Sequence, residues 1–170
     1  MATYTLISSN VLSSSAASVT FSSIPATYTD LVLRVSARMS VAGPDNINVQ
    51  INSFTNSHSY TDVYGSGSTA TSTRATGVGF FRLQNILIGT EATANTFCSA
   101  ECYFPSYTNS ANKVMGHFGV GEDNITNPVY AVATAGLLSQ TATISSLTIT
   151  PAGGSFVSGS SFYLYGISNA

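Results

Sequence analysis

The chain has 170 residues, of which only 7% are Asp, Glu, Lys or Arg, and its formal net charge is −2 at pH 7. Soluble domains usually contain about 25% charged residues, so hydroxyl and amide groups must cover much of this surface. Five basic residues argue against a nucleic-acid partner, and the 44% of hydrophobic residues argues against a disordered chain.

The length predicts a single domain, which we place over residues 1–170. The apolar runs are too short to span a membrane, and the first residues lack the basic and apolar segments of a secretory signal. We therefore expect a protein that is made in the cytosol and that has neither nucleic acid nor a membrane as a partner.

Apolar and polar residues alternate with a period of two in three segments of the first half of the chain. These segments are residues 17–22, 31–39 and 47–52. Pro, Gly and Asn residues typical of turns lie between them, at 24–25 and 43–46. Alternation over such short segments predicts half-buried antiparallel strands.

The segment of residues 65–79 is rich in Ser, Thr and Gly and poor in large apolar residues. This composition predicts an exposed, mobile loop. The alternative is a contact loop, because binding residues concentrate on loops that a rigid scaffold holds in place.

The same alternation returns in the second half of the chain. It covers residues 98–104, 147–150 and 162–165. Turn residues are found around 119–124, 127–128 and 151–154, and no segment has the apolar stripe of a helix. About eight or more short strands with this spacing predict an all-β fold. We expect an antiparallel β-sandwich of jelly-roll-like type.

Cys98 and Cys102 are four positions apart in one of the predicted strands, and therefore on the same face of it. In an extended strand their Cα atoms are ~13 Å apart, whereas a disulfide requires at most ~7 Å. We expect two reduced cysteines that are buried as small hydrophobic residues.

Residues that could perform catalysis are few and scattered. We expect His58 in an exposed loop and His117 at the end of a strand, and no Gly-x-Ser-x-Gly motif accompanies them. The carboxylates lie mostly in separate turn-like segments, and only Glu122 and Asp123 are adjacent. The others considered are Asp45, Asp62, Glu91 and Glu101. We predict that the protein is not an enzyme and has no catalytic residues.

The sequence predicts no metal or cofactor site either. Cys98, Cys102 and His117 offer soft ligands, but two thiols so far apart along a strand cannot share one zinc ion. The turns at 43–46 and 121–124 resemble calcium-binding loops only loosely, and ordinary turns of the Asx type account for them.

The composition suits surface contact better than chemistry. Tyr provides a broad, rigid contact area, and Ser, Gly and Asn provide adaptable hydrogen bonds; the chain has nine Tyr and 14 Gly. The alternative is that most of the Tyr and Phe residues fill the core of the sandwich. Because strand edges and charge-poor faces need covering, we predict a homo-oligomer, with a trimer as the first choice.

Segments spread over nearly the whole chain carry a further pattern. They are residues 4–8, 19–25, 28–35, 94–97, 105–109, 144–151 and 159–167, the last of which includes Tyr165-Gly166-Ile167. Together they resemble a group of tailed-bacteriophage virion proteins that are labelled head decoration, cement or tail-fibre proteins. The resemblance implies a jelly-roll-like sandwich that forms homotrimers on a virion, which is assembled in the host cytoplasm.

Two roles follow from this resemblance. In the first, the chain is a capsid decoration or cement subunit that binds the major capsid protein on the outer surface and stabilises the shell. In the second, it is the receptor- or glycan-binding tip of a tail or head fibre, with a glycan of the host surface as ligand. The short chain without a coiled-coil shaft favours the first role.

Overall fold

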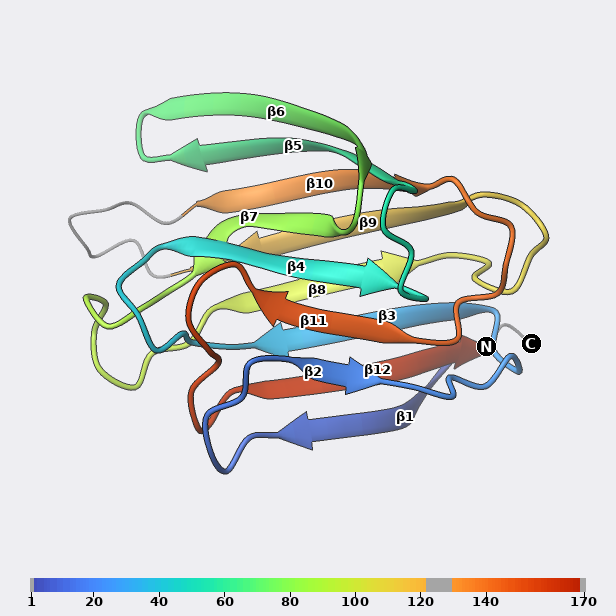
Figure 1. Cartoon of the computed structure of the whole chain (residues 1–170), viewed down its shortest axis with the longest axis horizontal. Coiled ribbons are helices and arrows are strands. Elements are labelled where there is room, and N and C mark those ends of the chain that lie inside the picture. The colour runs from blue at the N-terminus through green and yellow to red at the C-terminus, as the bar shows by residue number, and fades with distance from the viewer. Residues whose placement is uncertain (1, 122–129, 169–170) are drawn as a thin grey trace.

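Twelve β-strands make up the part of the chain that the structure, a computed structural model, describes: residues 2–121 and 130–168 (Figure 1). They are β1 (Thr3–Val11), β2 (Val19–Phe21), β3 (Asp30–Ser36), β4 (Asp45–Ile51), β5 (His58–Ser66), β6 (Thr69–Val78), β7 (Phe81–Leu87), β8 (Ser99–Phe104), β9 (Lys113–Val120), β10 (Ala131–Leu138), β11 (Leu147–Pro151) and β12 (Ser161–Ser168). Within these residues there is no helix, and so none that could cross a membrane.

The strands form two sheets that pack face to face. The larger sheet has eight strands in the order β1-β12-β3-β8-β9-β10-β5-β6, and the smaller has four in the order β2-β11-β4-β7. All of the strand pairs are antiparallel. Figure 1 shows the smaller sheet in front of the middle of the larger one, with the chain passing repeatedly between them. The predicted all-β, antiparallel sandwich is confirmed.

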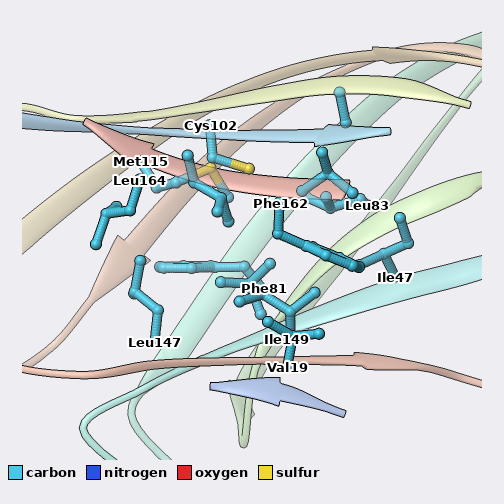
Figure 2. Close-up of a cluster of buried hydrophobic side chains, with 14 of the residues drawn as sticks. Val19, Ile47, Phe81, Leu83, Cys102, Met115, Leu147, Ile149, Phe162 and Leu164 are labelled. Atoms are coloured by element: carbon cyan, nitrogen blue, oxygen red, sulfur yellow. The ribbon is translucent and has the colours of Figure 1, made fainter. Parts of the chain in front are cut away.

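One hydrophobic core fills the space between the sheets. Alternating residues of most strands point into it, which is why these strands have a period of two, whereas β1 and β6 have no buried residue. In β4, for example, Ile47, Val49 and Ile51 are completely buried. Figure 2 shows Phe162 of the larger sheet in the same cluster of side chains as Phe81 of the smaller sheet.

Most of the segments predicted to be strands coincide with strands of the structure. The alternating segments are found in β2, β3, β4, β8, β11 and β12. Cys98 and Cys102 have free thiols and are 1% and 0% exposed, as predicted. The alternation of large aliphatic residues was therefore a sufficient signal for the strands that line the centre of the core.

The prediction of a loop at residues 65–79 is wrong. The segment contains the end of β5, a tight turn and all of β6, which together form a hairpin. Gly67 occupies the turn with a φ of +70°, the left-handed region that a two-residue hairpin turn favours. β6 has few apolar residues because it is an edge strand with most of its side chains exposed, and Thr is a good strand former.

Both histidine predictions are also wrong. His58 is the first residue of β5 and is completely buried, with its ring 4.9 Å from that of Phe81 in an edge-on contact. His117 lies inside β9 and is 5% exposed. Histidine is intermediate between polar and apolar residues in its tendency to be buried, and these two side chains lie in the interior of the sandwich.

Candidate functional site

β9 and β10 are neighbours in the larger sheet, and their outward-facing residues are all apolar or glycine. These residues are Val114, Gly116, Phe118, Val120, Ala131, Ala133, Ala135 and Leu137. Val63 of β5 continues the row beyond Ala133. We call Val63, Val114, Phe118 and Leu137, together with the small residues between them, the apolar face. Phe118 is 60% exposed and Val63 57%, although large apolar side chains usually point inward.

The inner side of the same two strands carries polar residues. His117 of β9 and Thr134 of β10 are each 5% exposed and are register partners. Thr134 is in turn the register partner of Asp62 in β5, which is completely buried, and Asp62 pairs with Thr73 of β6. A polar row, His117–Thr134–Asp62–Thr73, therefore crosses four strands on the inner face of the sheet. The usual polarity of a half-buried strand is therefore reversed along much of β9, whereas β10 also buries two core residues, Val132 and Leu138.

Hydrogen bonds run along the polar row. The Thr134 hydroxyl donates to Asp62 Oδ1 at 2.7 Å, and His117 Nδ1 is 3.1 Å from Thr134 Oγ1. Since the single hydroxyl proton of Thr134 is used for Asp62, His117 Nδ1 must be the donor in the second bond. The neutral ring is thus protonated at Nδ1, and its Nε2 is an acceptor that is buried without a hydrogen-bond partner among the described residues.

Arg82 of β7 approaches the row from the smaller sheet. Its Nη2 is 3.6 Å from Asp62 Oδ2 and donates to Thr73 Oγ1 at 3.2 Å. Thr73 donates to Asp62 Oδ2 at 3.3 Å. The guanidinium carbon lies 5.1 Å from the ring centre of Tyr60, in a cation–π contact. Asp62 therefore has a positively charged neighbour and two hydroxyl donors.

Burial controls the ionisation of this row. Desolvation lowers the pKa of His117 to about 4, so the ring is neutral at pH 7. Burial raises the pKa of Asp62, and the hydrogen bond from Thr134 and the charge of Arg82 oppose this effect. Because His117 is almost completely buried, its free Nε2 is not within reach of a solute. The arrangement can hold a structure together, but it does not present a base to a substrate.

A groove with a volume of about 630 Å³ lies on the outer face of the larger sheet, on β12, β3, β8 and β9. The side chains that form it include Arg34, Ser99, Glu101, Phe118, Tyr163 and Tyr165. One row of register partners, Tyr163–Arg34–Glu101–Phe118, crosses the groove from β12 to β9. Its floor is the ion pair of Arg34 Nε with Glu101 Oε2 at 2.8 Å, and aromatic rings stand on both sides.

Of the other carboxylates considered in the sequence, the two that the structure describes, Asp45 and Glu91, bind backbone groups in separate places. Asp45, at the start of β4, accepts a hydrogen bond from the backbone NH of Asn46 at 2.7 Å. Glu91 accepts one from the backbone NH of Gly43. Glu122 and Asp123 lie outside the described residues. The side chains of Asp45 and Glu91 therefore stabilise backbone segments.

The soft ligands do not converge. Cys102 is the register partner of His117, but Cys98 lies four positions earlier, just before β8 begins. Among residues 2–121 and 130–168, no three His, Cys, Asp or Glu side chains are placed to hold a metal ion.

Sequence reasoning missed both the apolar face and the groove. The run of Gly and Ala in 131–138 hid the alternation of β10, because these small residues show little contrast between the two faces. The four residues of the groove row come from distant parts of the chain and meet only through the order of the strands.

Comparisons with known proteins found no family model that matches the chain, no similar curated protein and no similar solved structure. The resemblance to phage virion proteins therefore stays a prediction.

Proposed function

We propose that the chain is a non-enzymatic contact module whose working surface is the apolar face of β9, β10 and β5. The exposed apolar side chains of β9 and β10 carry this proposal: Val114, Phe118 and Leu137 are exposed, while the imidazole of His117 and the hydroxyl of Thr134 occupy buried positions of the same two strands. Contiguous exposed apolar residues are typical of surfaces that bind another protein.

The edges of the larger sheet support the same role. β1 and β6 are long edge strands with mostly exposed side chains. β1 has no charged residue and β6 has only Arg74. Proteins usually protect such edges with charges, Pro or covering segments, so an assembly that covers them is a reasonable state for this chain. We expect a homotrimer in solution whose shared surface buries the apolar face together with these edges.

Because the sequence resembles tailed-phage virion proteins, we propose that the partner is the major capsid protein of such a phage. The chain is then a decoration or cement subunit on the outer surface of the virion. A rigid, charge-poor sandwich suits this role, because many copies must bind a fixed lattice without rearranging. The virion is then the place where the protein acts, after assembly in the host cytoplasm.

Light scattering at micromolar concentration tests the contact face directly. Phe118→Lys combined with Leu137→Lys should convert the oligomer to monomer, because two charges would have to be buried in the contact. Val41→Lys is the control, since Val41 is 40% exposed but lies outside the strands. An oligomer that is unchanged by the double substitution would contradict the proposed face.

The virion role has its own test. A copy number close to that of the major capsid protein, and capsids that lose heat resistance without the protein, would support the cement role. A copy number close to that of a fibre, or binding of the isolated protein to host cells, would favour the receptor- or glycan-binding alternative. The groove on β12, β3, β8 and β9 is the feature that supports this alternative.

A further inference from the structure

We infer that the groove on the outer face of the larger sheet binds an uncharged saccharide. The ligand would lie across β12, β3, β8 and β9, over the ion pair of Arg34 and Glu101 and between the aromatic side chains at either side. This inference rests on the glycan-binding alternative and goes beyond the contact role, because it assigns a chemical class of ligand to the groove. Phe118 is the one large residue that the groove shares with the apolar face, so a saccharide and a protein at the apolar face would compete for it.

The aromatic rings provide apolar surfaces of the right kind. Tyr163 and Tyr165 project from the same side of β12, with ring centres 6.5 Å apart and planes inclined by only 27°. Phe118 stands on the other side, about 14 Å away if three strand spacings of about 4.8 Å separate β12 from β9. Sugar rings have apolar CH faces that stack on such side chains, and the Tyr hydroxyl groups remain available for hydrogen bonds.

The charges of the groove favour a ligand without charge. Arg34 and Glu101 neutralise each other over 2.8 Å, and Arg34 also lies 5.7 Å from the ring centre of Tyr165. An anionic ligand would have to compete with Glu101 for Arg34, and a cationic ligand would have to compete with Arg34 for Glu101. A neutral polyhydroxyl ligand can instead accept hydrogen bonds from the guanidinium and donate them to the carboxylate while the pair stays intact.

The position of the groove in the sheet argues against an extended peptide as the ligand. Peptides that bind sheets usually pair their backbone with a free edge strand. Here β12, β3, β8 and β9 each have neighbours on both sides, so their backbone groups are already used in the sheet. Only side chains line the open side, and they offer stacking surfaces and hydroxyl, guanidinium and carboxylate groups.

The experiment titrates the full chain with cellohexaose, maltohexaose and N-acetylchitohexaose by calorimetry. Trigalacturonic acid and chitohexaose serve as the anionic and cationic probes. We expect at least one neutral probe to bind, with the amide signals of Glu101 and Phe118 among those that shift in NMR spectra of the unsubstituted protein. Tyr163→Ala combined with Tyr165→Ala should weaken binding by at least about tenfold, since each lost ring removes a stacking contact.

Tyr4→Ala is the matched control. Tyr4 is 56% exposed on the same face of the sheet, in β1, but it does not line the groove, so its removal should leave the affinity unchanged. Binding of none of the neutral probes, binding of the charged probes alone, or shifts outside the groove would each overturn the inference. The NMR shifts of the unsubstituted protein test the saccharide site even if the double variant of Tyr163 and Tyr165 fails to fold. A chain that binds capsids but none of these sugars would leave the contact role intact and exclude the saccharide site.

Discussion

Thr134 donates a hydrogen bond to Asp62 across the β10–β5 pair, over 2.7 Å, in the interior of the sandwich. Thr134→Val keeps the shape of the side chain but leaves Asp62 Oδ1 without this donor. We expect the free energy of unfolding to fall by ~1–3 kcal/mol, the penalty for a buried polar atom without its partner. Urea unfolding measures the loss. Thr61→Val, at an exposed position of β5, should change it by less than about 0.5 kcal/mol, and equal effects would contradict a stabilising role for the bond.

The stability of the fold should decrease in mild acid. The folded chain takes up a proton on His117 only near pH 4, whereas the unfolded chain does so near pH 6.5. The unfolded state therefore binds more protons between these values, and stability is lost as the pH falls through this range. Because one pKa unit corresponds to about 1.4 kcal/mol, the contribution of His117 is about 3 kcal/mol when fully developed.

Two other groups modify this pH dependence. Burial lowers the pKa of His58, which adds to the loss of stability in acid. Burial raises the pKa of Asp62, so its protonation favours the folded state and counteracts the loss at the acidic end. Urea unfolding between pH 4 and pH 7 should show a shallower decline in His117→Asn than in the unsubstituted protein. An NMR titration in which His117 has a pKa near 6.5 in the folded state would contradict the prediction.

The two cysteines should be unreactive in the folded protein. Burial raises the pKa of the Cys98 thiol to about 12 and also raises that of Cys102, and the thiolate is the form that reacts with alkylating reagents. Iodoacetamide at pH 8, followed by mass spectrometry, should add no label to the folded protein and two labels in guanidinium chloride. Rapid labelling without denaturant would show that β8 opens readily.

Close packing on the inner side of β10 should make Gly136 sensitive to substitution. A Cβ atom at Gly136 would lie 2.6 Å from Cε1 of Phe81, whereas a Cβ atom at Gly116, on the outer side of β9, would have no atom within 4 Å. We expect Gly136→Ala to destabilise the fold by ~1–3 kcal/mol and Gly116→Ala to change its stability by less than about 0.5 kcal/mol. Thermal unfolding compares the two, and similar values would contradict the packing in this region.

The sequence was most informative where large aliphatic residues alternate with polar ones. Ile47, Val49 and Ile51 show which residues share a face, and their size shows that this face points inward. In β9, the alternation also groups residues by face, but Phe118 points outward and His117 inward. Period alone does not say which face is buried, so the rule that apolar residues point inward gives the wrong answer here.

The groove could not be predicted for a different reason. Arg34, Glu101 and Tyr163 come from three strands that are far apart in the chain, and their proximity depends on the order of the strands. That order results from packing of the whole sandwich and has no local signature in the sequence.

The polar row also bears on how the chain selects one pairing of its strands. A slip of one residue would turn every side chain of a strand to the opposite face. In β9 and β10 such a slip would bring Phe118 and Leu137 into the core, but it would expose the core residues Met115, Val132 and Leu138. Because apolar residues lie on both faces, hydrophobic burial distinguishes the two registers of this hairpin less sharply than it does in β4. The bonds of the polar row add to the difference, because His117, Thr134 and Asp62 are aligned only in the observed register. Replacing the row with apolar residues would then narrow the difference in stability between the two registers, even if the core gained hydrophobic surface.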